Sequence, residues 1–100
     1  MGQKQSTKSR TTLMPFSGIR YSENSQRVDY EAGEEACVLC GAPLARARQT
    51  HWVRVVDGGR FGRRSDPDDG PGEMGCFPVG SRCRWRLVRA GVEVWEEDRC

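Results

Sequence analysis

Five cysteines occur in a chain of only 100 residues, at positions 37, 40, 76, 83 and 100. Charged residues make up 30% of the chain and hydrophobic residues only 36%, so the core that it can bury is small. Small domains of this kind are usually held together by disulfides, a metal ion or a partner. The cysteines are therefore the feature on which a prediction of the fold depends most.

The sequence predicts neither a membrane-spanning helix nor a secretion signal, although Gly2 and Ser6 stand where a short and common myristoylation pattern has them. No stretch approaches the roughly 20 apolar residues of a membrane-spanning helix, and no apolar run follows the polar N-terminus. We therefore expect a cytoplasmic protein that does not contact a membrane. In that reducing setting, neighbouring cysteines indicate a metal site more often than a disulfide.

The motif Cys37-x-x-Cys40-Gly41 has the spacing of a zinc knuckle. Two intervening residues let both thiolates point at one ion, and the glycine lets the backbone turn so that amides face the sulfurs. Cys83 offers a third ligand near the start of a predicted helix, whose N-terminus favours negative charge. The cofactor that these residues predict is Zn²⁺.

Two residues compete for the fourth ligand position, Cys76 and His51. The six residues between Cys76 and Cys83 make a wide spacing, which Pro78 and Gly80 can fold back. His51 is the only histidine, and both Cys₄ and Cys₃His sets are ordinary structural zinc sites. We predict a metal site formed by Cys37, Cys40, Cys76 and Cys83, with His51 as the alternative fourth ligand. An iron–sulfur cluster on the same cysteines is a less favoured alternative. The long gap between Cys40 and Cys76 does not fit the cysteine spacing of WhiB-like iron–sulfur regulators.

The clearest secondary structure is a valine-rich strand over residues 50–57. A turn at Asp57-Gly58-Gly59 follows it, and residues 60–63 are the expected return strand of a hairpin. Residues 65–75 are too polar and too rich in glycine and proline for regular structure. A last short strand is expected around residues 92–95.

A helix is predicted over residues 83–90, with Ser81 as its cap. Trp85, Val88 and Leu87 are expected to face inward, and Gly91 suits the C-terminal end. The sequence therefore predicts a small α+β fold, zinc-stapled, with one β-hairpin and one short C-terminal helix. The order of knuckle, hairpin, loop and helix is that of a treble-clef or zinc-ribbon-like module. We expect a disordered, basic N-terminal arm over residues 1–30 and the zinc-binding domain over residues 31–100.

Residues 74–83, Met-Gly-Cys-Phe-Pro-Val-Gly-Ser-Arg-Cys, resemble a segment of a group of small bacterial, plasmid and phage zinc-finger proteins. Those proteins pair a C-x-x-C-G knuckle with a valine-rich strand, a D-G turn and a late G-aromatic-F-P-V-G-S-x-C segment. The resemblance covers about residues 36–90 and implies a small zinc-binding domain without a known activity. Relatives often have histidine in place of Arg54 and a large aromatic residue in place of Cys76. If that histidine is the fourth ligand in the relatives, the resemblance implies that Cys76 takes its role in this chain.

The net charge of +2 conceals alternating blocks of charge. Six arginines lie within residues 41–65 and four within residues 76–92, whereas acidic residues gather in 66–75 and 93–100. Arginine favours planar, bidentate contacts with phosphate or carboxylate groups. We predict a module that binds nucleic acid through the residues of the C-terminal helix, namely Arg82, Arg84, Arg86, Arg89 and the stacking residue Trp85.

The alternative function is a zinc-stapled protein-interaction or regulatory factor, of phage or mobile-element type, that docks on a host protein. Alternating charge blocks suit such a surface, because they select a partner of complementary charge. No enzyme is expected, because the sequence shows no catalytic set of residues. It has a single histidine, no serine–histidine pair of the kind that hydrolases use, and no glycine-rich phosphate-binding loop. A small-molecule substrate is not expected either.

Overall fold

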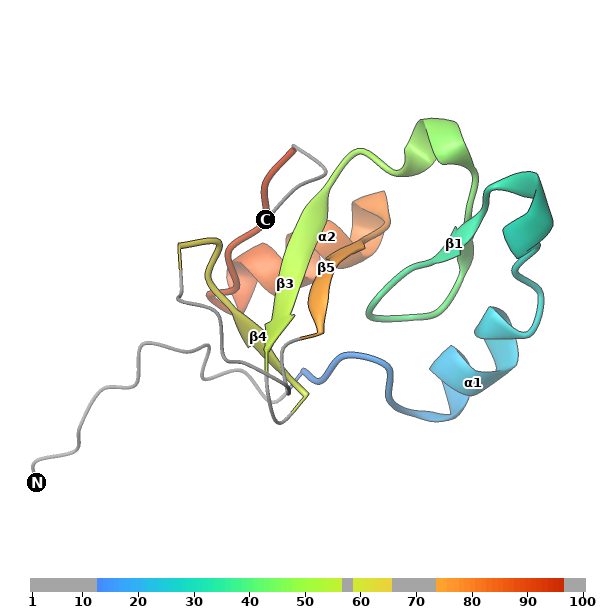
Figure 1. Cartoon of the computed structure of the whole chain (residues 1–100). Coiled ribbons are helices and arrows are strands. Elements are labelled where there is room, and N and C mark those ends of the chain that lie inside the picture. The colour runs from blue at the N-terminus through green and yellow to red at the C-terminus, as the bar shows by residue number, and fades with distance from the viewer. Residues whose placement is uncertain (1–12, 57–58, 66–73, 97–100) are drawn as a thin grey trace, which may run out of the picture.

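The computed structural model describes residues 13–56, 59–65 and 74–96, and these form the small α+β fold that the sequence predicts (Figure 1). This part of the chain contains two antiparallel sheets, two α-helices and two short 3₁₀ helices. In chain order the elements are α1 (Ile19–Ser25), η1 (Tyr30–Ala32), β1 (Glu35–Ala36), β2 (Pro43–Leu44), η2 (Arg46–Arg48), β3 (Trp52–Val56), β4 (Arg60–Gly62), β5 (Gly75–Pro78) and α2 (Ser81–Arg89).

The first sheet consists of β1 and β2, which pair antiparallel and are joined by residues 37–42. This joining loop contains the predicted knuckle, and Figure 1 shows it directed toward β5. A backbone hydrogen bond of 3.0 Å from the amide of Val38 to the carbonyl of Pro78 ties the loop to the end of β5. The knuckle is therefore held against the second sheet at the point where α2 is about to begin.

The second sheet has the strand order β4-β3-β5 and is antiparallel throughout. The strand and the return strand predicted around residues 50–63 are confirmed as β3 and β4, while positions 57 and 58 of the predicted turn lie outside the described residues. Four of the five residues of β3 are buried. Among them is Arg54, whose guanidinium group donates to the carbonyl of Arg63 at 3.2 Å.

No strand is predicted at β5, because Gly75, Pro78 and Gly80 are residues typical of turns. In the structure β5 pairs with β3, and Cys76 lies opposite Arg54. The proline is tolerated because β5 is an edge strand and Pro78 is its last residue. The pairing joins residues that are 20 to 26 positions apart in the sequence, so no local sequence pattern predicts it.

The predicted C-terminal helix is confirmed as α2, but it begins two residues earlier, at Ser81, and its N-cap residue is Gly80, so the predicted cap at Ser81 is wrong. Its buried residues are Cys83 and Leu87, four positions apart and therefore on one face of the helix. The predicted inward orientation of Trp85 and Val88 is wrong, because these side chains are 58% and 45% exposed. The two large apolar residues lie on the neighbouring face and meet solvent.

The N-terminal segment differs from the predicted arm. Residues 1–12 lie outside the described residues, but from residue 13 onward the segment belongs to the fold. The amide of Phe16 donates to the carbonyl of Val38 at 3.0 Å, and its ring packs edge-on against Phe77 with ring centroids 4.9 Å apart. Both α1 and η1 precede the knuckle, so helical structure already occurs within residues 13–30.

The strand predicted around residues 92–95 is present only as an isolated bridge between Trp52 and Trp95. Their backbones exchange hydrogen bonds of 2.8 and 3.1 Å, which attach the segment after α2 to β3. The buried core lies among the knuckle, β3, β4 and α2, and its largest fully buried side chains are those of Phe61 and Leu87. Neither helix that the structure describes is long and apolar enough to cross a membrane.

Candidate metal centre

Three of the predicted ligands, Cys37, Cys40 and Cys83, come together in the structure. Their sulfur atoms all lie within 4.8 Å of one another, although the first two and the third are more than 40 positions apart in the sequence. Cys37 and Cys83 are buried, and Cys40 is partly exposed. We call these three residues the thiol cluster; it is the only such group of possible metal ligands among the residues that the structure describes.

The knuckle positions two of the three sulfurs through its backbone hydrogen bonds. The amide of Cys37 donates to the carbonyl of Ala42 at 2.9 Å, and the amide of Gly41 donates to the carbonyl of Cys37 at 2.7 Å. These bonds close the tight turn that directs Cys37 and Cys40 to the same side. On the outside of the turn, the side-chain amide of Asn24 donates to the carbonyl of Cys40 at 2.9 Å, so α1 supports the knuckle.

The third sulfur comes from the first turn of α2. Cys83 is the third residue of the helix, where free amides and the helix dipole favour negative charge. The amide of Gly80, at the N-cap, lies 3.3 Å from the Cys37 sulfur and donates to it. This donor was missed in the sequence, although Gly80 stands at the same two-residue spacing from Cys83 that separates Cys37 from Cys40.

The proximity of the thiols shifts their acidities in opposite directions. A hydrogen bond from the Cys83 thiol, aided by backbone amides that include that of Gly80, lowers the pKa of Cys37 to about 5 although burial opposes this shift. The pKa of Cys83 is raised, because its proton is held in the hydrogen bond to Cys37 and because burial and the nearby thiolate disfavour a second charge. A cation replaces such shared protons, so metal affinity should rise with pH.

The other two predicted ligands lie outside the thiol cluster. Cys76 is on β5, and its sulfur is held in a disulfide bond, which removes the thiolate that a metal needs. The ring of His51 is engaged elsewhere: the Arg84 guanidinium lies 2.6 Å from Nε2, and the Thr50 hydroxyl lies 2.9 Å from Nδ1. Because a guanidinium only donates, the Nε2 lone pair of His51 is already occupied.

The thiol cluster fits a soft cation with a preference for sulfur. Three thiolates at this mutual distance can bind one ion, and Zn²⁺ is the metal that commonly takes such sets in a tetrahedral arrangement with a fourth ligand. Cys37, Cys40 and Cys83 would hold the ion, and the amide of Gly80 would stabilise the charge on sulfur.

The residues predicted to bind nucleic acid divide into two groups. Arg82, Arg86, Arg89 and Trp85 are exposed on α2. Arg84 is instead half-buried, bonded to His51 and stacked over the Trp85 ring at 4.7 Å from its centroid.

Comparison with known proteins adds no relative: no family model, curated protein or solved structure matches this chain.

Replacement of Gly41 by alanine should destabilise the knuckle. Gly41 has φ +80°, and a Cβ atom there would lie 2.5 Å from the backbone oxygen of Tyr21. We expect Gly41→Ala to lower the free energy of unfolding by about 2–5 kcal/mol. This is the sum of the cost of a left-handed conformation for alanine and the cost of the clash with the backbone. Urea denaturation of the metal-loaded protein measures this loss.

Gly59→Ala is the matched control for that substitution. Gly59 also has a positive φ, +68°, but nothing lies within 4 Å of the added Cβ. The Gly59→Ala variant should therefore lose only about 1–2 kcal/mol of unfolding free energy, the cost of a left-handed conformation for alanine. Equal losses in the two variants would show that the contact between the knuckle and Tyr21 is not as tight as the structure has it.

Proposed function

We propose that this chain is a non-enzymatic zinc-binding module of treble-clef type that binds nucleic acid through the exposed face of α2. The order of knuckle, hairpin and ligand-bearing helix supports the treble-clef assignment, and it agrees with the resemblance to small bacterial, plasmid and phage zinc-finger proteins. In this proposal the ion stabilises the fold and takes no part in a reaction.

The observation that carries the nucleic-acid assignment is an exposed aromatic residue within a stripe of exposed arginines. Arg82, Arg86 and Arg89 are spaced by four and three positions, which aligns them along one side of α2. Trp85 lies between them and is 58% exposed. No salt bridge joins any of these arginines to an acidic residue within the described part of the chain. Arginines beside an open aromatic ring suit phosphates and a stacked base.

The rigidity of this surface comes from the metal centre and from Arg84. Cys83 lies in the first turn of α2, so a bound ion would anchor the start of the helix to the knuckle. The guanidinium of Arg84 covers part of the Trp85 ring and is itself fixed by His51. These contacts hold Trp85 outward at low entropic cost, which favours stacking by an unpaired base over insertion into a duplex.

Neutralisation of the arginine stripe should weaken binding and its salt dependence together. We expect Arg82→Gln/Arg86→Gln/Arg89→Gln to make the slope of log K against log [salt] shallower by about 2, since each phosphate contact contributes roughly 0.7 on a single strand. Trp85→Ala should lose about 1–3 kcal/mol of affinity for a single strand. Fluorescence anisotropy with labelled single- and double-stranded oligonucleotides across a salt series measures both.

Arg27→Gln is the control for this series, because Arg27 is also exposed but follows α1 rather than lying on α2. It should leave the salt slope almost unchanged. The proposal fails if the wild-type, metal-loaded protein binds neither oligonucleotide at low salt, or if the triple variant binds as the wild type does.

A protein partner is the second candidate, and the exposure of Val88 favours it. Val88 is 45% exposed beside Trp85, so α2 offers an apolar patch as well as charge. A host protein with an acidic rim and an apolar pocket would fit this face. Pull-down with nuclease treatment separates the candidates: a protein retained after digestion and lost with Val88→Asp supports the second, whereas recovery of nucleic acid alone supports the first.

A further inference from the structure

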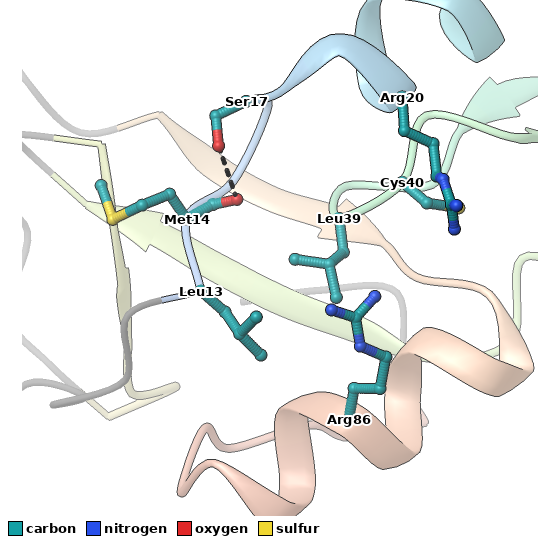
Figure 2. Close-up of a pocket in the computed structure, with 7 residues that line it drawn as sticks. All are labelled: Leu13, Met14, Ser17, Arg20, Leu39, Cys40 and Arg86. Carbon is teal, nitrogen blue, oxygen red and sulfur yellow. Dashed lines mark hydrogen bonds between the residues drawn. The ribbon is translucent and has the colours of Figure 1, made fainter.

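A pocket of about 310 Å³ lies between α1, the knuckle and α2 (Figure 2). Its volume is at the lower end of the roughly 300–1,000 Å³ found for small-molecule sites. A backbone hydrogen bond joins Phe16 to Val38 of the knuckle, so that residues 13–17 pass close to the knuckle before α1 begins. The pocket lies beside this segment. Its lining residues are Leu13, Met14, Ser17, Arg20, Leu39, Cys40 and Arg86.

The wall of this pocket combines two cations with an apolar surface. Arg20 comes from α1 and Arg86 from α2, and Figure 2 shows their side chains extending from opposite sides toward Leu39 and Cys40. Leu13 and Met14 line another part of the wall, and Ser17 places a hydroxyl there. Within residues 13–56, 59–65 and 74–96, neither guanidinium forms a salt bridge.

We infer that this pocket binds a small organic oxyanion, one carboxylate or phosphate group carried on an apolar body. Two guanidinium groups that line one pocket repel each other. An anion bound between them offsets this repulsion and accepts a charge-assisted hydrogen bond from each. The apolar part of the ligand covers Leu13, Met14 and Leu39, which inorganic anions cannot do. The ligand is bound without being transformed, since the lining holds no pair of acid and base groups.

The pocket also touches the metal centre. Cys40, a member of the thiol cluster, is one of its lining residues and is only partly buried. A ligand seated there would shield the Cys40 sulfur from solvent, including any bond that it forms to a metal ion, and would brace α1 against α2. This inference goes beyond the proposed nucleic-acid binding: Arg86 belongs to both surfaces, whereas Arg20 lines the pocket and is not part of the arginine stripe.

Titration of the metal-loaded full chain with four probes, followed by ¹H–¹⁵N NMR, tests the inference. Benzoate and phenyl phosphate carry an anion on the same ring, benzyl alcohol lacks the charge, and inorganic phosphate lacks the ring. At least one of the two aromatic anions should shift the amides of Leu39 and Cys40 and the Nε–H signals of Arg20 and Arg86 saturably. Which of them binds identifies the anionic group. Benzyl alcohol and inorganic phosphate should bind at least tenfold more weakly.

Variants separate this site from the nucleic-acid surface. Arg20→Gln should lower affinity for the anionic probe at least tenfold while it leaves oligonucleotide binding within twofold, and Arg27→Gln should change neither. Since α1 buries no side chain, Arg20→Gln is not expected to unfold the protein, and its amide spectrum verifies this. The inference is overturned if benzyl alcohol binds as tightly as the anions, if neither anion saturates the pocket, or if Arg20→Gln retains full affinity.

Discussion

Removal of the metal ion is expected to unfold the chain around the three cysteines. The core is small, and the knuckle meets the start of α2 through the thiol cluster, the hydrogen bond from the Gly80 amide to the Cys37 sulfur, and a small shared apolar cluster. A structural zinc site contributes roughly 10–16 kcal/mol of apparent binding free energy, whereas a typical small domain is stable by about 5–15 kcal/mol in total. A strong chelator should therefore abolish most of the far-ultraviolet circular dichroism signal of β3, β5 and α2.

Substitution of a single ligand should reproduce the effect of the chelator. Cys37→Ser leaves two thiolates and places a hydroxyl in a fully buried position, so we expect loss of the ion and of the cooperative unfolding transition. The matched control is Cys76→Ser in a reducing buffer, because Cys76 lies outside the cluster. A dichroism spectrum that strong chelator leaves unchanged would contradict the dependence of the fold on metal.

The substitution Gly80→Cys is expected to complete the metal site. Gly80 is the N-cap residue of α2 at φ −73°, a backbone conformation open to any residue. A Cβ atom built there would lie 3.8 Å from the Cys37 sulfur and 3.5 Å from Leu44, both ordinary contacts. The new thiol and Cys83 would form a second Cys-x-x-Cys pair, with the same spacing as the pair in the knuckle.

We expect this fourth thiolate to raise the affinity for Zn²⁺ by at least about tenfold, equivalent to roughly 1.4 kcal/mol. With Co²⁺ as a spectroscopic probe, the sulfur-to-cobalt charge-transfer absorbance should increase relative to the wild type. Gly80→Ser is the matched control, since serine has nearly the same shape and is a favoured cap but a poor metal ligand. If Gly80→Cys and Gly80→Ser have the same affinity and cobalt spectrum, the fourth position does not face Gly80.

Local sequence was sufficient to predict the knuckle, β3 and the position of Cys83 beside the two cysteines of the knuckle. The spacing of Cys37 and Cys40 fixes a tight turn by itself, and the valine-rich run of β3 is a strand wherever it packs. Cys83 could be included because a helix start favours a thiolate. These features depend on neighbours in the sequence, so they need no knowledge of the tertiary fold.

The remaining features depend on contacts that the sequence does not display. The pairing of β5 with β3 goes with the position of Cys76 outside the thiol cluster, and no local sequence pattern indicates that pairing. Nothing in α1 is buried, so this helix lacks the apolar period that would have predicted it. The predicted inward orientation of Trp85 is wrong because Cys83 and Leu87, four positions apart, form the buried face of α2.

We infer that Cys37, Cys40 and Cys83 together bind one zinc ion. Native mass spectrometry with elemental analysis of the purified protein tests it most directly. We predict one zinc ion per chain, lost from each of Cys37→Ser, Cys40→Ser and Cys83→Ser and retained in Cys76→Ser and His51→Ala. A metal-free wild-type chain, bound iron in place of zinc, or retention of the ion when a member of the thiol cluster is replaced would show that these cysteines do not form a zinc site.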